Sequence, residues 1–130
     1  MESVCAFLKK CGVYYLATVE GDQPRVRPFG VAEMIDGKLY FLTGKKKDVS
    51  RQMRANPKIE ISGTCGSEWI RIEALAVEDD RVAVREQILD LVPSLKSMYQ
   101  ADDGNCQVFY LKDATATFYS FGGAPKSVKF

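Results

Sequence analysis

The sequence predicts a mainly β domain in which about six antiparallel strands curl to close their edges, with short helices over the ends. Three observations indicate this class. Apolar and β-branched residues alternate in several short segments, turn signals such as Asp36-Gly37 separate these segments, and the helical stretches between them are short. A length of 130 residues suits one core, so we expect a single domain over residues 1–130.

The first half of the chain predicts a helix, three strands and a second helix. Ser3 can cap a helix that runs to about Lys10, and Gly12 ends it. Strands follow at residues 13–20, 25–34 and 38–43, joined as antiparallel hairpins. Asp48 is a good N-cap for a short helix over residues 48–56, which Pro57 brings to an end.

The second half predicts two more strands, a broken helix and a final strand. Residues 58–63 and 68–79 alternate as strands, with Ile59 and Ile61 on one face. Residues 80–99 are helical to about Leu91 and restart at Pro93. Residues 106–121 form a last strand or hairpin, and residues 122–130 read as a tail.

The charge balance excludes one broad class of function. Eighteen basic and seventeen acidic residues give a net charge of +1, whereas a nucleic-acid binder needs a wide excess of Lys and Arg. No segment is long and apolar enough to span a membrane or resembles a targeting signal. The four cysteines form no C-x-x-C pair, so we expect reduced thiols and a cytoplasmic protein.

Histidine is absent from the chain. This removes Ser-His-Asp and Cys-His nucleophile systems, and every zinc or haem site that needs imidazole. We expect no metal site from the scattered cysteines. If the protein is an enzyme, a bound organic cofactor carries the reaction.

The stretch FLTGKKKDVSRQ, from Phe41 to Gln52, has the parts of an anion site. Thr43 offers a hydroxyl, Gly44 allows close backbone approach, and a helix start supplies free N–H groups beside three lysines. Together they can hold one phosphate. The alternative is a solvated turn, and the carboxylate of Asp48 competes for the helix start.

The stretch RVRPFG, which begins at Arg25, predicts an unusual strand. Arg25 and Arg27 share one face, which is either solvent-exposed or turned toward a ligand, and Phe29 shares that face. Pro28 cannot donate a ladder hydrogen bond, so the strand is an edge strand or bulged there. Free backbone groups at such a break could bind a flat heteroaromatic ring, but edge protection is an equally good explanation.

Trp69 is the only tryptophan and lies in the alternating segment 68–79. A core position is the default for one large aromatic residue, and a wall of a ring-binding pocket is the functional alternative. Arg71 and Glu73 share its face, so that face is no simple core and can contact a partner subunit.

Taken together, RVRPFG, LYFLTGKKKDVSRQMRANPKIEI and EWIRIEA resemble the pyridoxamine 5'-phosphate oxidase-like FMN-binding split barrels, in particular the short general-stress and nitroimidazole-resistance-like members. The resemblance covers nearly the whole chain. It implies a six-stranded antiparallel split barrel that forms a homodimer, with FMN in two clefts at the subunit interface.

The resemblance also implies which residues bind FMN. The start of the second strand contributes one group, the end of the third strand and the lysines that bind phosphate contribute another, and the partner's long strand contributes the last. Lys47 fits the most regular lysine position best. The matching residues are Arg25, Val26, Arg27, Pro28, Leu42, Thr43, Lys45, Lys46, Lys47, Glu68 and Trp69.

The expected function is that of a small FMN-binding flavoprotein, an oxidoreductase that passes electrons to or from an unidentified small molecule. The Arg- and His-bearing C-terminal extension of pyridoxamine 5'-phosphate oxidases has no match here, so vitamin B6 oxidation is not expected. Nitroimidazole-reductase relatives often use a histidine near the flavin, so that role is doubtful too. The alternatives are a non-enzymatic flavin or haem-type binding or redox-sensing module, and a deazaflavin-dependent reductase.

Overall fold

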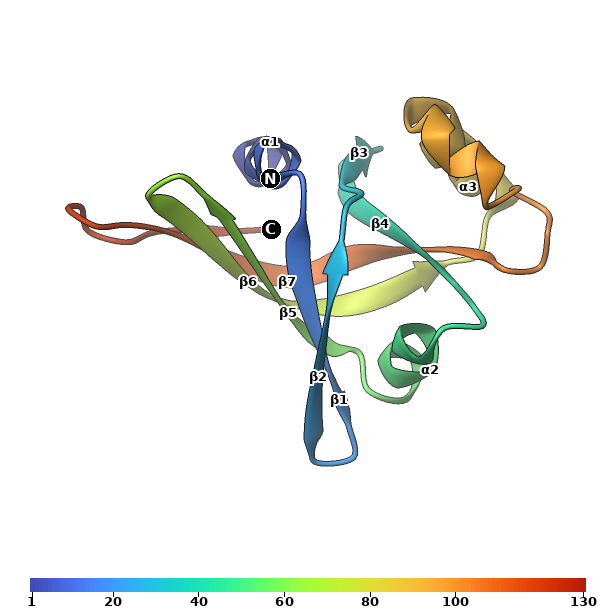
Figure 1. Cartoon of the computed structure of the whole chain (residues 1–130), viewed down its shortest axis with the longest axis horizontal. Helices are drawn as coiled ribbons and strands as arrows, with labels where there is room; N and C mark the ends of the chain where they lie inside the picture. Colours follow the sequence, from blue (N-terminus) through green and yellow to red (C-terminus); the bar gives the residue numbers. More distant parts are fainter.

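The computed structural model describes residues 1–130 and contains one antiparallel sheet of eight strands (Figure 1). Seven strands follow the order β2-β1-β5-β6-β7-β4-β3, and β8 pairs with β7. In chain order the elements are α1 (Glu2–Cys11), β1 (Tyr14–Glu20), β2 (Gln23–Phe29), β3 (Glu33–Ile35), β4 (Lys38–Gly44), α2 (Asp48–Ala55), β5 (Lys58–Cys65), β6 (Glu68–Asp79), α3 (Val82–Leu91), the 3-10 helix η1 (Pro93–Ser97), β7 (Cys106–Ser120) and β8 (Lys126–Lys129).

The predicted mainly β class is confirmed, but the sheet has eight strands where six were expected. The expected strand 25–34 is two strands, because pairing stops after Phe29 and resumes at Glu33. The expected tail contains β8, which pairs with the second half of β7. That half of β7 would otherwise be an unpaired edge, since β4 covers only the first half.

The sheet curls so that its two ends meet around one core. β2 and β4 lie far apart in the strand order, yet the rings of Phe29 and Phe41 are 5.5 Å apart. The Tyr14 hydroxyl donates a hydrogen bond to the carbonyl of Val31, which also ties β1 to the segment after β2. This closure is the split-barrel form. The core within it includes Leu16, Phe41, Ile61, Ile72 and Phe109.

Edge protection explains Pro28. β2 pairs only with β1, so the missing N–H of the proline breaks no ladder between two neighbours. The prediction of an edge strand is confirmed.

Two predicted helix caps are wrong. α1 begins at Glu2 with Met1 at the N-cap, so Ser3 lies inside the first turn. α2 begins at Asp48 itself, and Lys47 takes the N-cap position without a side-chain cap. The helices are still held by packing, because Val4 and Leu8 of α1 and Val49 and Met53 of α2 are buried in the core.

The predicted break between Leu91 and Pro93 is confirmed, and it shapes the region beside β4. α3 ends at Leu91 and η1 begins at Pro93. A second apolar cluster joins this pair of helices to the sheet through Leu42, Ile88 and Tyr99, among others. None of the helices has the length and the apolar composition that a membrane-spanning helix needs.

Candidate functional site

The three lysines occupy the turn between β4 and α2, and their side chains are exposed. The backbone N–H of Lys45 donates to the carbonyl of Asn105 at 2.8 Å, and that of Lys46 donates to the Asn105 side chain at 3.1 Å. A Cβ on Gly44 would lie 3.1 Å from the Asn105 side chain and 3.2 Å from the Tyr99 hydroxyl. The absence of a side chain at Gly44 therefore lets the backbone lie close to Asn105 and Tyr99, and these contacts fix the position of the turn.

The start of α2 is open to an anion. Lys47, at the N-cap, makes no side-chain hydrogen bond to the helix. The Asp48 side chain is 82% exposed and pairs with Arg51 at 3.3 Å. It therefore does not occupy the helix start, in contrast to the expectation from the sequence. The free N–H groups and the positive end of the helix dipole remain beside Lys47.

A cavity of about 360 Å³ lies beside this turn and contains five of the predicted site residues. Strand β2 and the residues after it form one side, β4 and Lys47 form another, and η1 with its flanking residues forms an apolar wall. The lining residues are Arg27, Pro28, Phe29, Gly30, Val31, Leu42, Thr43, Lys47, Val92, Ser94, Leu95, Met98 and Tyr99. Arg27 and Lys47 are the only charged residues among them, and both are positive.

Arg27 is held inside the barrel by a polar network. Its Nη1 donates to the Leu16 carbonyl at 3.1 Å and to Thr18 Oγ1 at 2.8 Å, and its Nη2 donates to Gln52 Oε1 at 2.6 Å. Burial, and then the positive charge of Arg25, lower the pKa of Arg27, which nevertheless stays charged. Three of its five N–H donors are used, so two remain for a ligand.

The two arginines of this strand differ in their surroundings. The interpretation of their face as solvent-exposed is wrong for Arg27, which lies opposite the buried Leu16. Arg25, at the end of the hairpin, is exposed and pairs with Glu20 at 3.2 Å. Only Arg27 lines the cavity.

Two buried polar groups next to the cavity have no hydrogen-bond partner. They are the Thr43 hydroxyl and the side-chain N–H group of Gln107, which lies directly opposite Thr43 in the β4–β7 pairing. The Gln107 oxygen accepts a hydrogen bond from Ser50 of α2. An unpaired buried polar group costs about 1–3 kcal/mol, and such groups are rare in folded proteins. Thr43, which lines the cavity, therefore fits a site for a polar ligand.

The other predicted residues do not meet at this cavity. Lys45, Lys46, Arg25 and Val26 are exposed outside it, and Val26 lies on the outer face of the hairpin. Glu68 and Trp69 lie at the turn between β5 and β6, on the opposite side of the molecule from α2 (Figure 1).

The pairing register gives the scale of this separation. Thr43 pairs with Gln107 and Trp69 pairs with Tyr119, and these partners are twelve residues apart (119 − 107) along β7. This corresponds to roughly 40 Å of strand. Trp69 is half-buried and stacks on Tyr119 with ring centroids 5.4 Å apart. It is not part of the buried core, so the default prediction of a core position is wrong. Within one chain, Trp69 cannot form a wall of the cavity.

Sequence reasoning missed the polar residues that support the site. Gln52 and Ser50 are buried on α2, and Gln107 is buried on β7, although each side chain is polar. The available signal was a polar residue within an otherwise apolar buried segment, since Gln107 follows Cys106 and precedes Val108. The apolar wall from η1 was also missed, because its distance along the sequence from β4 conceals their contact.

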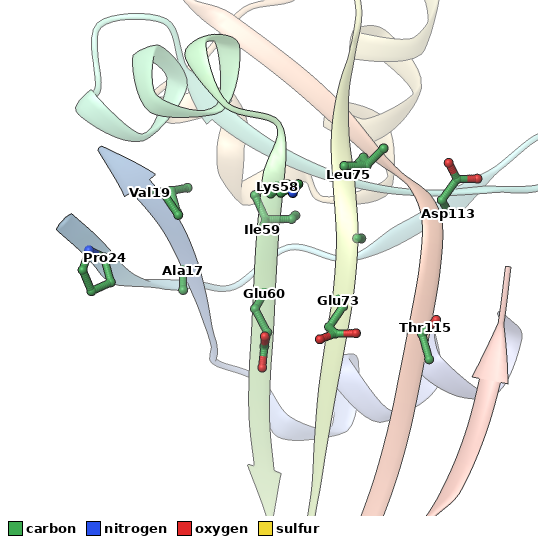
Figure 2. A pocket seen from close by; sticks show the side chains of 12 residues that line it. Ala17, Val19, Pro24, Lys58, Ile59, Glu60, Glu73, Leu75, Asp113 and Thr115 are labelled. Atoms are coloured by element: carbon green, nitrogen blue, oxygen red, sulfur yellow. The ribbon is translucent and has the colours of Figure 1, made fainter. Parts of the chain in front are cut away.

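A second, larger cavity of about 520 Å³ lies on the outer face of β1, β5, β6 and β7 (Figure 2). None of the predicted site residues lines it. Its surface carries charges of both signs, among them Lys58, Glu60 and Glu73.

Comparison with known proteins gives a consistent assignment. The family model described as pyridoxamine 5'-phosphate oxidase matches residues 1–116. A NimC/NimA family protein from Clostridium acetobutylicum is 46% identical, with a TM-score of 0.98 over 100% of this chain and 92% of that chain. General stress protein 26 from Bacillus anthracis has 18% identity and a TM-score of 0.72, covering 95% of this chain and 98% of that one. No curated protein sequence matches.

The same fold occurs in an F420 reductase, with 20% identity, a TM-score of 0.62, and coverage of 82% of this chain and 90% of that chain. At this identity the likeness concerns the fold alone. The resemblance predicted from the sequence motifs is confirmed by the family model and by the NimC/NimA and general stress structures.

Proposed function

The chain belongs to the pyridoxamine 5'-phosphate oxidase family, and on that premise we propose that it is a small FMN-binding flavoprotein. In this proposal it acts as an oxidoreductase that exchanges electrons with a small molecule. It works as a cytoplasmic homodimer, with its four cysteines as free thiols.

One observation carries the proposal: the composition of the cavity beside α2. Its two charged lining residues are both cationic, its Thr43 hydroxyl lacks a partner, and its remaining wall is mostly apolar. A ligand with one anionic end and a flat apolar body suits this surface. FMN has both features, as a phosphate and an isoalloxazine ring.

The chain's own residues would divide the work of holding this ligand. Lys47, the Thr43 hydroxyl and the open start of α2 would bind the phosphate. The two remaining N–H donors of Arg27 would bind polar atoms of the ligand. Val31, Leu95 and Met98 would exclude water from part of the ring. FMN, when bound, supplies the electron-transfer chemistry.

The second subunit has a defined part in the proposal. Glu68 and Trp69 lie too far from the cavity of their own chain, so they would approach the cavity of the partner. The corresponding residues of each subunit then complete the other's site, as in an isologous dimer.

The experiment measures both the cofactor and its phosphate. Purified protein, or apoprotein mixed with FMN, is expected to show flavin absorbance near one FMN per chain, and riboflavin is expected to bind distinctly more weakly. Equal affinity for the two would remove the phosphate role from the lysine turn. A preference for a deazaflavin would favour the reductase alternative, and FMN binding without turnover by a nicotinamide donor would favour a non-enzymatic module.

A further inference from the structure

Two polar residues beside the cavity are brought together by the pairing of their strands. Thr43 of β4 and Gln107 of β7 are direct partners in the antiparallel register. The side chains of such partners point to the same face of a sheet, with Cβ atoms about 4.5–5.5 Å apart. Thr43 is 2% exposed and Gln107 is 1% exposed, and neither the Thr43 hydroxyl nor the Gln107 side-chain N–H group has a partner. An unpaired donor therefore lies next to an unpaired hydroxyl, away from solvent.

Ser50 determines which end of the Gln107 amide is left free. Ser50 lies in the first turn of α2 and is fully buried, and its hydroxyl donates a hydrogen bond to Gln107 Oε1. With its oxygen held in this way, the amide offers an N–H donor to its other neighbours. The start of α2, Gln107 and Thr43 are thus neighbours in one buried polar group.

The other polar group on the same helix differs in this respect. The oxygen of Gln52 accepts hydrogen bonds from Thr18 at 2.5 Å and from Arg27 at 2.6 Å, so both the amide oxygen and the Thr18 hydroxyl have partners. The group of Ser50, Gln107 and Thr43 has two open members, and Thr43 lines the cavity. Buried polar groups are nearly always satisfied in folded proteins, so an atom of a bound ligand is a natural partner for Thr43.

We propose that Gln107 is a positioning residue for a phosphate monoester: when the anion binds, the Gln107 N–H group donates to Thr43 Oγ1, and the Thr43 hydroxyl is thereby directed to a phosphate oxygen. The inference rests on the phosphate site of the proposed function and adds a residue that does not touch the ligand. From Ser50 through Gln107 and Thr43, every hydrogen bond then donates toward the anion. Hydrogen bonds aligned in this way strengthen one another, and a phosphate dianion, which only accepts, fits the end of the series.

The test compares FMN with riboflavin, because the two differ in the phosphate. The Gln107→Met variant has a side chain of nearly the same length without the N–H group. The ratio of the riboflavin dissociation constant to that of FMN is expected to fall about three- to tenfold, as for the loss of one hydrogen bond. In a Thr43→Val background the same change is expected to leave the ratio unaltered, because the hydroxyl that Gln107 positions is absent.

The ratio separates positioning from a merely structural role. A residue that only supports the fold, or that binds an internal water in every state, affects both flavins equally and leaves the ratio unchanged. Ser50→Ala removes the bond that orients the amide and is expected to lower the ratio less than Gln107→Met does. The control is Gln23→Met, a change at an exposed glutamine at the start of β2, which is expected to leave the ratio as in the parent. Circular dichroism confirms that each variant is folded.

Two results would overturn the inference: a ratio that Gln107→Met leaves unchanged, or losses from Gln107→Met and Thr43→Val that multiply in the double variant. If Gln107→Met does not fold, the NMR spectrum of the parent protein decides. The side-chain amide signal of Gln107 is expected to move downfield with FMN or inorganic phosphate, and not with riboflavin. A signal that neither FMN nor inorganic phosphate moves would also overturn the inference. A parent protein that shows the shift with inorganic phosphate but binds no FMN would support the role of Gln107 and remove only the proposed cofactor.

Discussion

The cavity beside α2 and the Trp69 end of β6 were both predicted to contact the same cofactor, yet the fold places them far apart within one chain. At the cavity, residues from β2, from β4, from η1 and from the turn before α2 converge in one chain. At the other end, the Trp69 ring stacks on Tyr119 and packs at a tilt against Phe121 of its own chain. The two regions are joined by β6 and β7, whose length separates them.

This difference shows that residues assigned to one cofactor by a shared motif pattern need not lie close together within one chain. Thr43 and Lys47 are four residues apart in sequence, so their closeness follows from a strand and a turn. Trp69 reaches the same cavity only if a second subunit brings it there. Substitutions at Arg27, Lys47, Thr43 and Trp69 can show whether the two regions act as one site.

The largest effect is expected at Arg27. The Arg27→Ala variant removes three charged hydrogen bonds, so the free energy of unfolding of the apoprotein should fall by about 2–3 kcal/mol, and FMN binding should weaken as well. Urea unfolding and FMN titration measure the two effects. Arg25→Ala, on the same strand, is the control and should cost at most about 1 kcal/mol, because its ion pair is exposed. Equal losses at both positions would argue against a special role for Arg27.

The next effect separates the three lysines. Lys47 lines the cavity, whereas Lys45 and Lys46 do not. Lys47→Ala should weaken FMN binding by about 1.5–3 kcal/mol, or roughly ten- to a hundredfold. Lys45→Ala and Lys46→Ala should change it much less, as measured by quenching of flavin fluorescence. Three indistinguishable titration curves that match the parent would make the turn a solvated surface.

A smaller effect with opposite signs is expected at Thr43. Thr43→Val removes a buried hydroxyl that has no partner, so the apoprotein should become more stable by about 1 kcal/mol while FMN binds more weakly. Thr18→Val is the matched control, because the Thr18 hydroxyl bonds Gln52 and Arg27 and its loss should destabilise the apoprotein. Urea unfolding of both apoproteins shows whether the signs differ. Destabilisation by Thr43→Val would contradict an unpaired hydroxyl.

The smallest effect connects the two regions. Trp69→Phe should weaken FMN binding by about 0.5–1 kcal/mol in the dimer, as expected for a contact with a single aromatic ring. The same change should have no effect on the binding that remains at protein concentrations low enough to dissociate the dimer. FMN titration of the parent and the variant at high and at low protein concentration measures this coupling. An equal loss at both concentrations would mean that Trp69 acts within its own chain.

Much of the fold could be predicted from local pattern. Alternation gave strand β6 with both ends as observed, Asp36-Gly37 gave the β3–β4 hairpin, and Pro93 marked the restart after α3. The errors arose where pairing between strands, and not the local sequence pattern, determines the secondary structure. β8 exists because β7 would otherwise expose an edge, and strand 25–34 divides where β2 runs out of partners.

The sequence by itself determined the class, the strand–turn–helix that presents Thr43 and Lys47, and the edge character of β2, because these depend on neighbouring residues and on backbone chemistry. Only the tertiary structure decided which positively charged side chains line the cavity. Curling of the sheet directed Arg27 into a network with Gln52 and left Arg25 in solvent. It also placed η1 against the end of β4 and kept Trp69 away. These contacts join segments far apart in the chain, so burial and hydrogen bonding of the whole fold select them.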